Sequence, residues 1–347
     1  MKKTLTTLLI LIVSISLVAC GGGSAPAPAA PAESAPEAAP AAPANDAPAA
    51  PAEGGQWKAG FITQAMSNES QAFSWREFQR LAPEYGFTMN MWSGETGPQD
   101  EVAGIEQAIA EGYDAIFVNP SSIESIIPAL MQAKEAGLIV GMFSSELPEE
   151  HQNLRDFFCG SDDFQGGQQA GEFVVTHFPD GASFVEVGGQ AGHDAQIKRH
   201  DGFRAGIAGS NIVELDSQNV PGPWPTNEAM AIMEDFLVRH GDAINIVFCH
   251  WDNGASGVIE AIENSGRKAN ADDGIFVIGV DGNRTGYAQV RAGTQALSVG
   301  QSFTNMAKQS LENAKTMLEG GTVPAVNFIP LDMVTLGSID SFVEPDW

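Results

Sequence analysis

Residues 114–120 read Asp114-Ala-Ile-Phe-Val-Asn-Pro120, and this stretch decides the fold. Its apolar centre has the β-branched and aromatic side chains typical of a strand that is buried on both faces. Before it, Val102, Ile105 and Ile109 recur at helical spacing and predict an amphipathic helix over Gln99–Ala110. A helix followed directly by a buried strand is half of a βαβ unit, in which a helix links two parallel strands and packs on their sheet.

The same alternation of short apolar runs and amphipathic stretches recurs roughly every 25 to 30 residues from Trp57 onward. It predicts an α/β protein with parallel sheets. The units are too many for one small sheet, and the polar segment Asp162–Gly167 interrupts them near the middle, so we expect two similar doubly wound lobes with a cleft between them. Strands are predicted at Lys58–Thr63, Phe87–Trp92, Asp114–Val118, Leu138–Met142, Ser183–Val187, Ile244–Phe248 and Ile275–Val280.

Polar side chains follow the predicted strands, at the sheet edge where open parallel sheets bind ligands. Carboxylates and amides hydrogen-bond to hydroxyl groups, and an aromatic face covers the apolar C–H side of a sugar ring. The loops therefore predict a site for a neutral polyhydroxyl ligand. They contain Ser67-Asn68-Glu69, Asn119-Pro120-Ser121-Ser122, Ser144-Ser145, Gly189-Gln190-Ala191-Gly192, His250-Trp251-Asp252-Asn253 and Asp281-Gly282-Asn283.

Five motifs occur in a fixed order along the chain. They are Asp114–Pro120, Gly160-Ser161-Asp162 with Gly166-Gly167 and Ala170-Gly171, Arg199-His-Asp-Gly-Phe203, Val277-Ile-Gly-Val-Asp-Gly282 and Ser298-Val-Gly-Gln301. Through them the chain, from Trp57 to about Leu336, resembles the type I periplasmic binding proteins of ABC sugar importers, the group that contains the ribose-binding protein. The resemblance implies two lobes joined by a three-crossover hinge, with the ligand clamped between them. The N-terminal lobe would comprise residues 57–161 and 302–331, and the C-terminal lobe residues 162–301 and 332–347.

The resemblance also implies roles for individual residues. Asp281 corresponds to the family's hydroxyl-binding carboxylate, Arg199 to its binding arginine, and Gln301 to its hinge glutamine. Asp281 could instead be a helix cap, and Arg199 could lie on a solvated helix face. The remaining predicted ligand-binding residues are Asn68, Gln71, Asn119, Ser144, Trp224 and Trp251, with Trp92 as a further stacking candidate.

The chain departs from the family pattern at two places. Ser144-Ser145 stands where pentose and hexose binders commonly have an Asp-Arg pair, and Ser70-Gln71 stands where they have paired aromatic residues. Stacking is therefore expected from Trp224 and Trp251 instead, although the prolines around Trp224 also suit a packed surface anchor. The ligand is left open as a sugar, a sugar alcohol or a cyclitol.

The beginning of the chain predicts export. Lys2 and Lys3 precede an apolar run over Leu8–Ala19, which is shorter than the roughly 20 residues of a spanning helix and is typical of a signal peptide. The sequence around Cys20 resembles the lipobox of bacterial lipoproteins, so we expect Cys20 to be lipidated; an ordinary cleavage site beside a cysteine is the alternative. Residues 21–56, rich in alanine and proline, predict an extended tether without a core.

Composition excludes several classes of protein. A formal charge of −27 argues against nucleic acid as a partner. The Gly188–Gly192 segment lacks the lysine and hydroxyl residue of a phosphate-binding loop, so no nucleotide cofactor is expected. His193 and His200 have no ligand-spaced partners, so no metal is expected either. Cys159 and Cys249 could pair in an oxidising compartment, but we expect them buried and reduced because they close strands of different lobes.

The leading function is therefore a lipid-anchored solute-binding protein outside the cytoplasmic membrane, monomeric and without catalytic activity. It would capture a small polyhydroxyl molecule and deliver it to the membrane permease of an ABC importer. A clamp that presents a sugar or autoinducer-like ligand to a membrane receptor is the alternative. A glycan hydrolase would need Asp281 with Glu186 or Asp252 as its carboxylate pair, and a cytosolic repressor is excluded by the export signal.

Overall fold

The computed structural model of the protein describes residues 57–270 and 272–347. The predicted signal peptide, the lipidated Cys20 and the tether over residues 21–56 lie outside the described residues and stay predictions. Both sheets described below belong to one compact unit.

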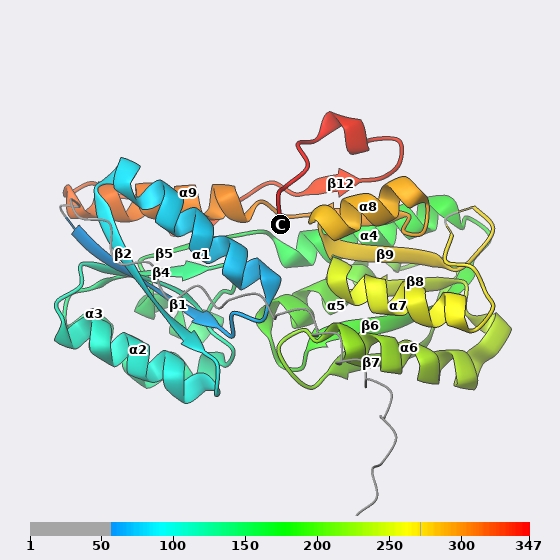
Figure 1. Ribbon diagram of the computed structural model, residues 1–347, viewed down its shortest axis with the longest axis horizontal. Coiled ribbons are helices and arrows are strands. Elements are labelled where there is room, and N and C mark those ends of the chain that lie inside the picture. Colours follow the sequence, from blue (N-terminus) through cyan, green and yellow to red (C-terminus); the bar gives the residue numbers. More distant parts are fainter. Residues whose placement is uncertain (1–56, 271) are drawn as a thin grey trace, which may run out of the picture. The chain divides into compact units, whose positions relative to one another are not determined.

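The first sheet has six strands, all parallel, and four helices cover it. The strands are β1 (Trp57–Gln64), β2 (Phe87–Gly94), β3 (Ala115–Asn119), β4 (Ile139–Phe143), β5 (Phe157–Gly160) and β11 (Val326–Phe328). The helices are α1 (Glu69–Leu81), α2 (Pro98–Ala110), α3 (Ile123–Glu135) and α9 (Phe303–Leu318). Figure 1 shows α1 and α9 on one face and α2 and α3 on the other, with a hydrophobic core under each pair. We call this sheet with its helices the N-terminal lobe.

The second sheet also has six strands, in the order β12-β10-β9-β8-β6-β7, and only β12 runs antiparallel to its neighbour. The strands are β6 (Ala182–Gln190), β7 (Ile212–Val220), β8 (Ile246–Cys249), β9 (Phe276–Asp281), β10 (Leu297–Gly300) and β12 (Asp332–Val334). The helices are α4 (Asp163–His177), α5 (Asp194–Ile207), α6 (Thr226–His240), α7 (Asp252–Asn264) and α8 (Arg284–Ala292). One core lies under α6 and α7 and another under α4 and α5. We call this part the C-terminal lobe.

The chain passes between the two sheets three times, after β5, after β10 and after β11. The predicted fold class, two doubly wound lobes with three crossovers, is thereby confirmed. The exact lobe boundaries at residues 161/162, 301/302 and 331/332 stay predictions.

Each predicted strand overlaps an observed one, and the order β11-β5-β4-β3-β1-β2 places β3 and β4 inside the first sheet. Both are buried along their whole length, because helices cover both faces of the sheet. The strands that the sequence did not predict are β5, β7, β10, β11 and β12. They are either three or four residues long or, like β7 at the sheet edge, mostly solvent-accessible, so they lack a long apolar run.

Trp347 is held by groups from both lobes. Its indole stacks on Phe73 of α1 with ring centroids 5.4 Å apart and meets Phe303 of α9 edge-on at 5.1 Å. Its carbonyl oxygen accepts a hydrogen bond of 2.6 Å from the backbone N–H of Arg284, at the start of α8. Residue 347 therefore packs in the N-terminal core while its backbone is fixed to the C-terminal lobe.

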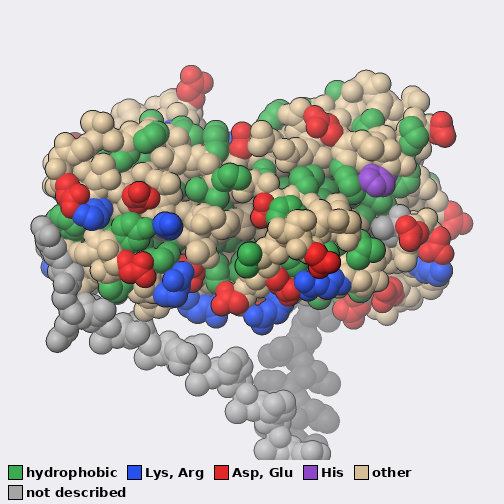
Figure 2. All heavy atoms as spheres, turned by 90° about the horizontal axis from the view of Figure 1, so that it is seen from above, with side chains coloured by type: hydrophobic (Ala, Val, Ile, Leu, Met, Phe, Trp, Pro, Cys, Tyr) green, Lys and Arg blue, Asp and Glu red, His purple; other side chains and the backbone are tan. Residues whose placement is uncertain are grey.

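Other surface and interior features bear on function only indirectly. Acidic and basic side chains lie interspersed along one edge of the face in Figure 2. Of the helices in the described ranges, none combines the length and the apolar character needed to cross a bilayer. Cys159 in β5 and Cys249 in β8 are buried and unpaired, and burial raises the pKa of both thiols.

Candidate ligand-binding site

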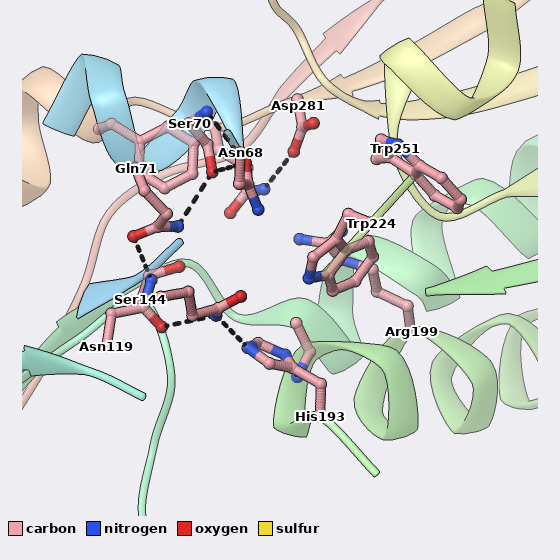
Figure 3. A pocket seen from close by; sticks show the side chains of 14 residues that line it. Asn68, Ser70, Gln71, Asn119, Ser144, His193, Arg199, Trp224, Trp251 and Asp281 are labelled. Atoms are coloured by element: carbon pink, nitrogen blue, oxygen red, sulfur yellow. Dashed lines mark hydrogen bonds between the residues drawn. The ribbon is translucent and has the colours of Figure 1, made fainter. Parts of the chain in front are cut away.

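A pocket lies where strand ends of the two lobes face each other, and fourteen residues line it (Figure 3). It encloses about 400 Å³ including its mouth. All nine predicted ligand-binding residues are among those that line it: Asn68, Gln71, Asn119, Ser144, Arg199, Trp224, Trp251, Asp281 and Gln301. The others are Gln64, Ser70, His193, Ala195 and Phe303. The structure thus brings the predicted set together, and ligand binding by these side chains stays a prediction.

Three pocket residues have a backbone conformation that is rare outside glycine. The φ angles are +63° at Ser144, +58° at Trp224 and +120° at Asp281, and in the described part of the chain no other non-glycine residue has a positive φ. Such conformations cost about 1–3 kcal/mol each and persist where the surrounding structure enforces them. Because the three strained residues all line one pocket, the strain makes this pocket the leading candidate for the functional site.

Asp281 ends β9 and faces the pocket. Its Oδ1 accepts a 3.0 Å hydrogen bond from Nε2 of Gln301, and burial raises its pKa to about 8 against the opposing effect of Arg199. The carboxylate has therefore lost water without gaining enough donors, and ligand hydroxyls could supply them. The alternative role as a helix cap belongs to Asn283, whose Oδ1 accepts a 2.9 Å hydrogen bond from the backbone N–H of Gly286 in α8.

Asp252, buried at the start of α7, holds the turn that follows Asp281. Its Oδ2 accepts hydrogen bonds from the backbone N–H of Gly282 at 2.8 Å and from the hydroxyl of Ser298 at 2.7 Å. Its Oδ1 accepts a 2.8 Å hydrogen bond from Nε2 of Gln295. The network fixes the turn and with it the direction of the Asp281 side chain.

Arg199 lies on α5 and is buried. Its Nε donates to Oδ1 of Asp163 at 2.7 Å, and Nη1 donates to the backbone carbonyl of His250 at 2.5 Å. Its guanidinium carbon stands 5.6 Å from the ring centroid of Trp224, a cation–π contact. Its charge is thus already paired inside the C-terminal lobe. The solvated-face alternative is wrong for this residue.

Trp224 and Trp251 meet edge to face, with ring centroids 5.5 Å apart and planes at 81°. Each indole packs directly on a glycine. A Cβ at Gly189 would come within 2.0 Å of the Trp224 ring, and one at Gly254 within 2.4 Å of the Trp251 ring. The two indoles are therefore fixed walls of the pocket.

The N-terminal lobe contributes amides, hydroxyls and Phe303, and no charged side chain. Oε1 of Gln71 accepts hydrogen bonds from the hydroxyl of Thr63 at 2.6 Å and from Nδ2 of Asn119 at 3.0 Å. Asn68 caps α1, since its Oδ1 accepts a 3.1 Å hydrogen bond from the backbone N–H of Ser70. These side chains hold one another in place and can exchange partners with ligand hydroxyls.

His193 links the lobes across the pocket. Its Nδ1 accepts a 3.2 Å hydrogen bond from the backbone N–H of Ala195, so the neutral ring carries its hydrogen on Nε2. Nε2 lies 2.9 Å from the side-chain amide of Gln64 on β1. The nearest amide atom is the nitrogen of Gln64, which is also a donor, so a turn of this amide by 180° would bring its oxygen, otherwise buried without a partner, into place to accept the hydrogen. Burial lowers the pKa of His193 to about 3, which keeps the ring neutral.

Two residues show where sequence reasoning failed. Gln64 directly follows the predicted first strand, so its position at a strand end is the signal that identifies it. His193 follows the glycine-rich loop, but its sequence context suggests only a metal ligand and so does not point to this role. Trp92, the further stacking candidate, is not at the pocket. Its Nε1 donates to Oε1 of Gln107 at 3.0 Å, and its ring packs on the backbone of Gly104 in α2.

Glu186 and Asp252, the two possible partners of Asp281 in the hydrolase alternative, do not line the pocket and already have hydrogen-bond partners. Glu186 is fully buried and accepts hydrogen bonds from His250 at 2.8 Å, His200 at 2.9 Å and Arg204 at 2.9 Å. Burial alone would raise the pKa of Glu186, but these three neighbours outweigh it and hold the pKa well below its usual range. Asp252 holds the turn described above. Within the described ranges, no group of three His, Cys, Asp or Glu side chains is arranged to hold a metal ion.

Known proteins share this architecture. The ribose import binding protein of Bacillus subtilis strain 168 is 27% identical over 257 residues, which cover 74% of this chain and 80% of that protein. A solute binding protein from Actinobacillus succinogenes, solved with bound D-allose, has a TM-score of 0.75 and 21% identity and covers 83% of this chain and 100% of its own. The Caulobacter myo-inositol binding protein has a TM-score of 0.75 and 19% identity over 82% of this chain and 95% of its own.

A family model described as a periplasmic binding protein domain matches residues 59–322. The match spans both lobes and most of the chain, and it includes every pocket residue. The sequence resemblance is therefore confirmed at the level of the family. The chain belongs to the periplasmic binding protein family.

Proposed function

We propose that the protein is an extracytoplasmic solute-binding protein that captures a neutral polyhydroxyl molecule and delivers it to an ABC importer. The ligand class comprises monosaccharides, sugar alcohols and cyclitols. The observation that carries the proposal is the composition of the pocket, in which amides and hydroxyls face a carboxylate, a paired arginine and two indoles. Ligand hydroxyls would donate to Asp281 and the amide oxygens, and the indoles would cover the apolar face of a ring.

Charged ligands fit this pocket poorly. The guanidinium of Arg199 is already paired with Asp163, so an acidic ligand would find no unpaired positive charge on this residue. A cation would meet only one pocket carboxylate, whose pKa burial raises to about 8. Relatives named for ribose, D-allose and myo-inositol support the neutral class without selecting one member of it.

The proposal includes binding without chemistry. Ligand that contacts both lobes favours a closed form, and an importer can recognise that form. The relatives are named as binding proteins, and Glu186 and Asp252 already have protein partners, which leaves Asp281 without a carboxylate partner at the pocket.

Anchoring through Cys20 completes the proposal and rests on the lipobox-like sequence alone. Cys20→Ala should abolish lipidation and leave either uncleaved precursor or soluble protein. Membrane fractionation with metabolic labelling by a radioactive fatty acid tests this. A Cys20→Ala protein that is cleaved and still partitions fully into detergent would contradict the anchor.

A thermal-shift screen of the purified protein tests the ligand class. The panel contains neutral monosaccharides, polyols and cyclitols beside gluconate and glucuronate as acidic counterparts of matched size. At 100 times its dissociation constant, a ligand adds about 2.7 kcal/mol of stability, which a melting curve resolves. Stabilisation by neutral members is expected. Stabilisation by the acidic members alone would contradict the proposal.

A further inference from the structure

We propose that the binding site continues into an outer chamber and that the protein takes a sugar with a second ring, such as a disaccharide or a glycosylated cyclitol. This inference rests on the proposed function, because it extends the same site. The chamber and the pocket share Asn68, Ser70, Trp224, Trp251 and Asp281, so the two spaces adjoin. Counting their mouths, the chamber encloses about 700 Å³ and the pocket about 400 Å³.

One wall of the outer chamber is aromatic and stiff. Trp224 stands between Pro223 and Pro225, whose rings restrict the loop, and its own φ is +58°. Trp251 and Trp347 also line the chamber, although each is only 4% exposed, so Trp224 is its main accessible indole. Aromatic faces and proline rings cover the C–H side of a sugar ring, and a wall that is already rigid loses little entropy when it binds.

The chamber also has a polar side, to which both lobes contribute: Glu69 comes from the N-terminal lobe and Asn253 from the C-terminal lobe. Nδ2 of Asn253 donates to Oε2 of Glu69 at 2.8 Å, while Oδ1 of Asn253 accepts from Nδ2 of Asn283 at 3.1 Å. The first of these bonds joins the loops of the two lobes beside the chamber. Carboxylate and amide oxygens of this kind accept hydrogen bonds from sugar hydroxyls.

One ring of the ligand would lie in the pocket, and the second ring would lie in the outer chamber. A ring held by Asp281 and Arg199 in the pocket reaches only the shared wall of the chamber. Water would then cover the accessible surfaces of Trp224, Pro223 and Pro225. A second ring attached to the first would displace that water and contact Trp224 and the Asn253–Glu69 bridge, which spans both lobes.

Calorimetry on the whole protein tests the chamber with matched sugars. The pairs are D-glucose with maltose and cellobiose, D-galactose with melibiose, and myo-inositol with galactinol. In at least one pair, the two-ring member is expected to bind at least tenfold more tightly than the single ring. The proposal is overturned if every single ring that binds does so as tightly as its two-ring counterparts.

Two variants test whether the outer chamber is responsible for the tighter binding of the two-ring sugar. Thr226 lines only the outer chamber, and Thr226→Trp would fill it; Ala231→Trp adds the same bulk on an exposed face of α6 and is the control. Thr226→Trp is expected to cost the two-ring sugar at least tenfold more affinity than the single ring, and Ala231→Trp to match the parent. Equal losses for both sugars would overturn the chamber. Failure of every sugar to bind the parent would instead refute the proposed ligand class itself.

Discussion

The two walls of the pocket, one from each lobe, are stabilised by different kinds of interaction. The N-terminal wall is neutral, and its amides and hydroxyls are held by hydrogen bonds to one another, as in the contacts of Gln71 with Thr63 and Asn119. The C-terminal wall combines a buried ion pair, Arg199 with Asp163, and indoles packed on glycines. A neutral hydrogen bond contributes about 1 kcal/mol, whereas removing one partner of a buried ion pair costs about 3–5 kcal/mol.

Because of this difference, we expect the two walls to play different roles in ligand binding. A ligand hydroxyl can replace a neutral amide contact at little cost, so the N-terminal wall can adapt to several hydroxyl patterns. The C-terminal wall cannot rearrange without breaking the Arg199 pair or lifting an indole from Gly189. We therefore expect the C-terminal lobe to bind first and orient the ring, and the N-terminal lobe to close over it.

The largest expected effect is on the charged wall. Arg199→Met should lower the free energy of unfolding by about 3–5 kcal/mol in the absence of ligand, because it leaves the buried Asp163 carboxylate unpaired. Urea denaturation measures this. The double variant Arg199→Met, Asp163→Asn should recover most of the loss. Equal instability of the single and double variants would show that the ion pair does not hold this wall.

The neutral wall should respond less. Gln71→Ala should lower the free energy of unfolding by about 1–3 kcal/mol, because it leaves the Thr63 hydroxyl and the Asn119 amide without their acceptor. Gln132→Ala on the exposed face of α3 is the matched control and should change stability little. A loss for Gln71→Ala as large as that for Arg199→Met would erase the distinction between the walls.

The smallest effect concerns strain in the neutral wall. Ser144 has φ at +63°, a conformation that costs an alanine about 1 kcal/mol more than a glycine. Ser144→Gly should therefore be more stable than Ser144→Ala by about 1 kcal/mol, as thermal denaturation of the two variants can show. If the two variants melt at the same temperature, the backbone at this position relaxes and the wall is not strained.

Sequence reasoning reached the fold because central strands such as Ala115–Asn119 are short apolar runs between amphipathic helices. It missed β11 and β12, which have three residues each and expose part of their side chains. It reached Asn68 and Asp281 because both follow or end strands. The partner of Arg199 was not predictable, because Asp163 lies 36 residues away and only the packing of α4 on α5 brings the two together.

The most direct test of the central claim is calorimetry at pH 6, 7 and 8 on the parent and on Asp281→Asn, with the best neutral sugar from the screen. Burial raises the pKa of Asp281 to about 8, so at pH 6 the ligand-free carboxyl group is protonated, and it must lose this proton before both of its oxygens can accept ligand hydroxyls with full charge. The parent's affinity should therefore rise at least tenfold from pH 6 to pH 8.

The same raised pKa costs the parent ligand-free stability as pH rises from about 4 towards 8, because the carboxyl group is easier to ionise in the unfolded chain. Asp281→Asn removes that cost, so it should melt no lower than the parent at pH 8 without ligand. With ligand, it should bind at least tenfold more weakly at pH 8, a loss of about 1.4 kcal/mol or more, and show no rise with pH. A variant that binds as tightly as the parent, or with the same pH dependence, would contradict the account.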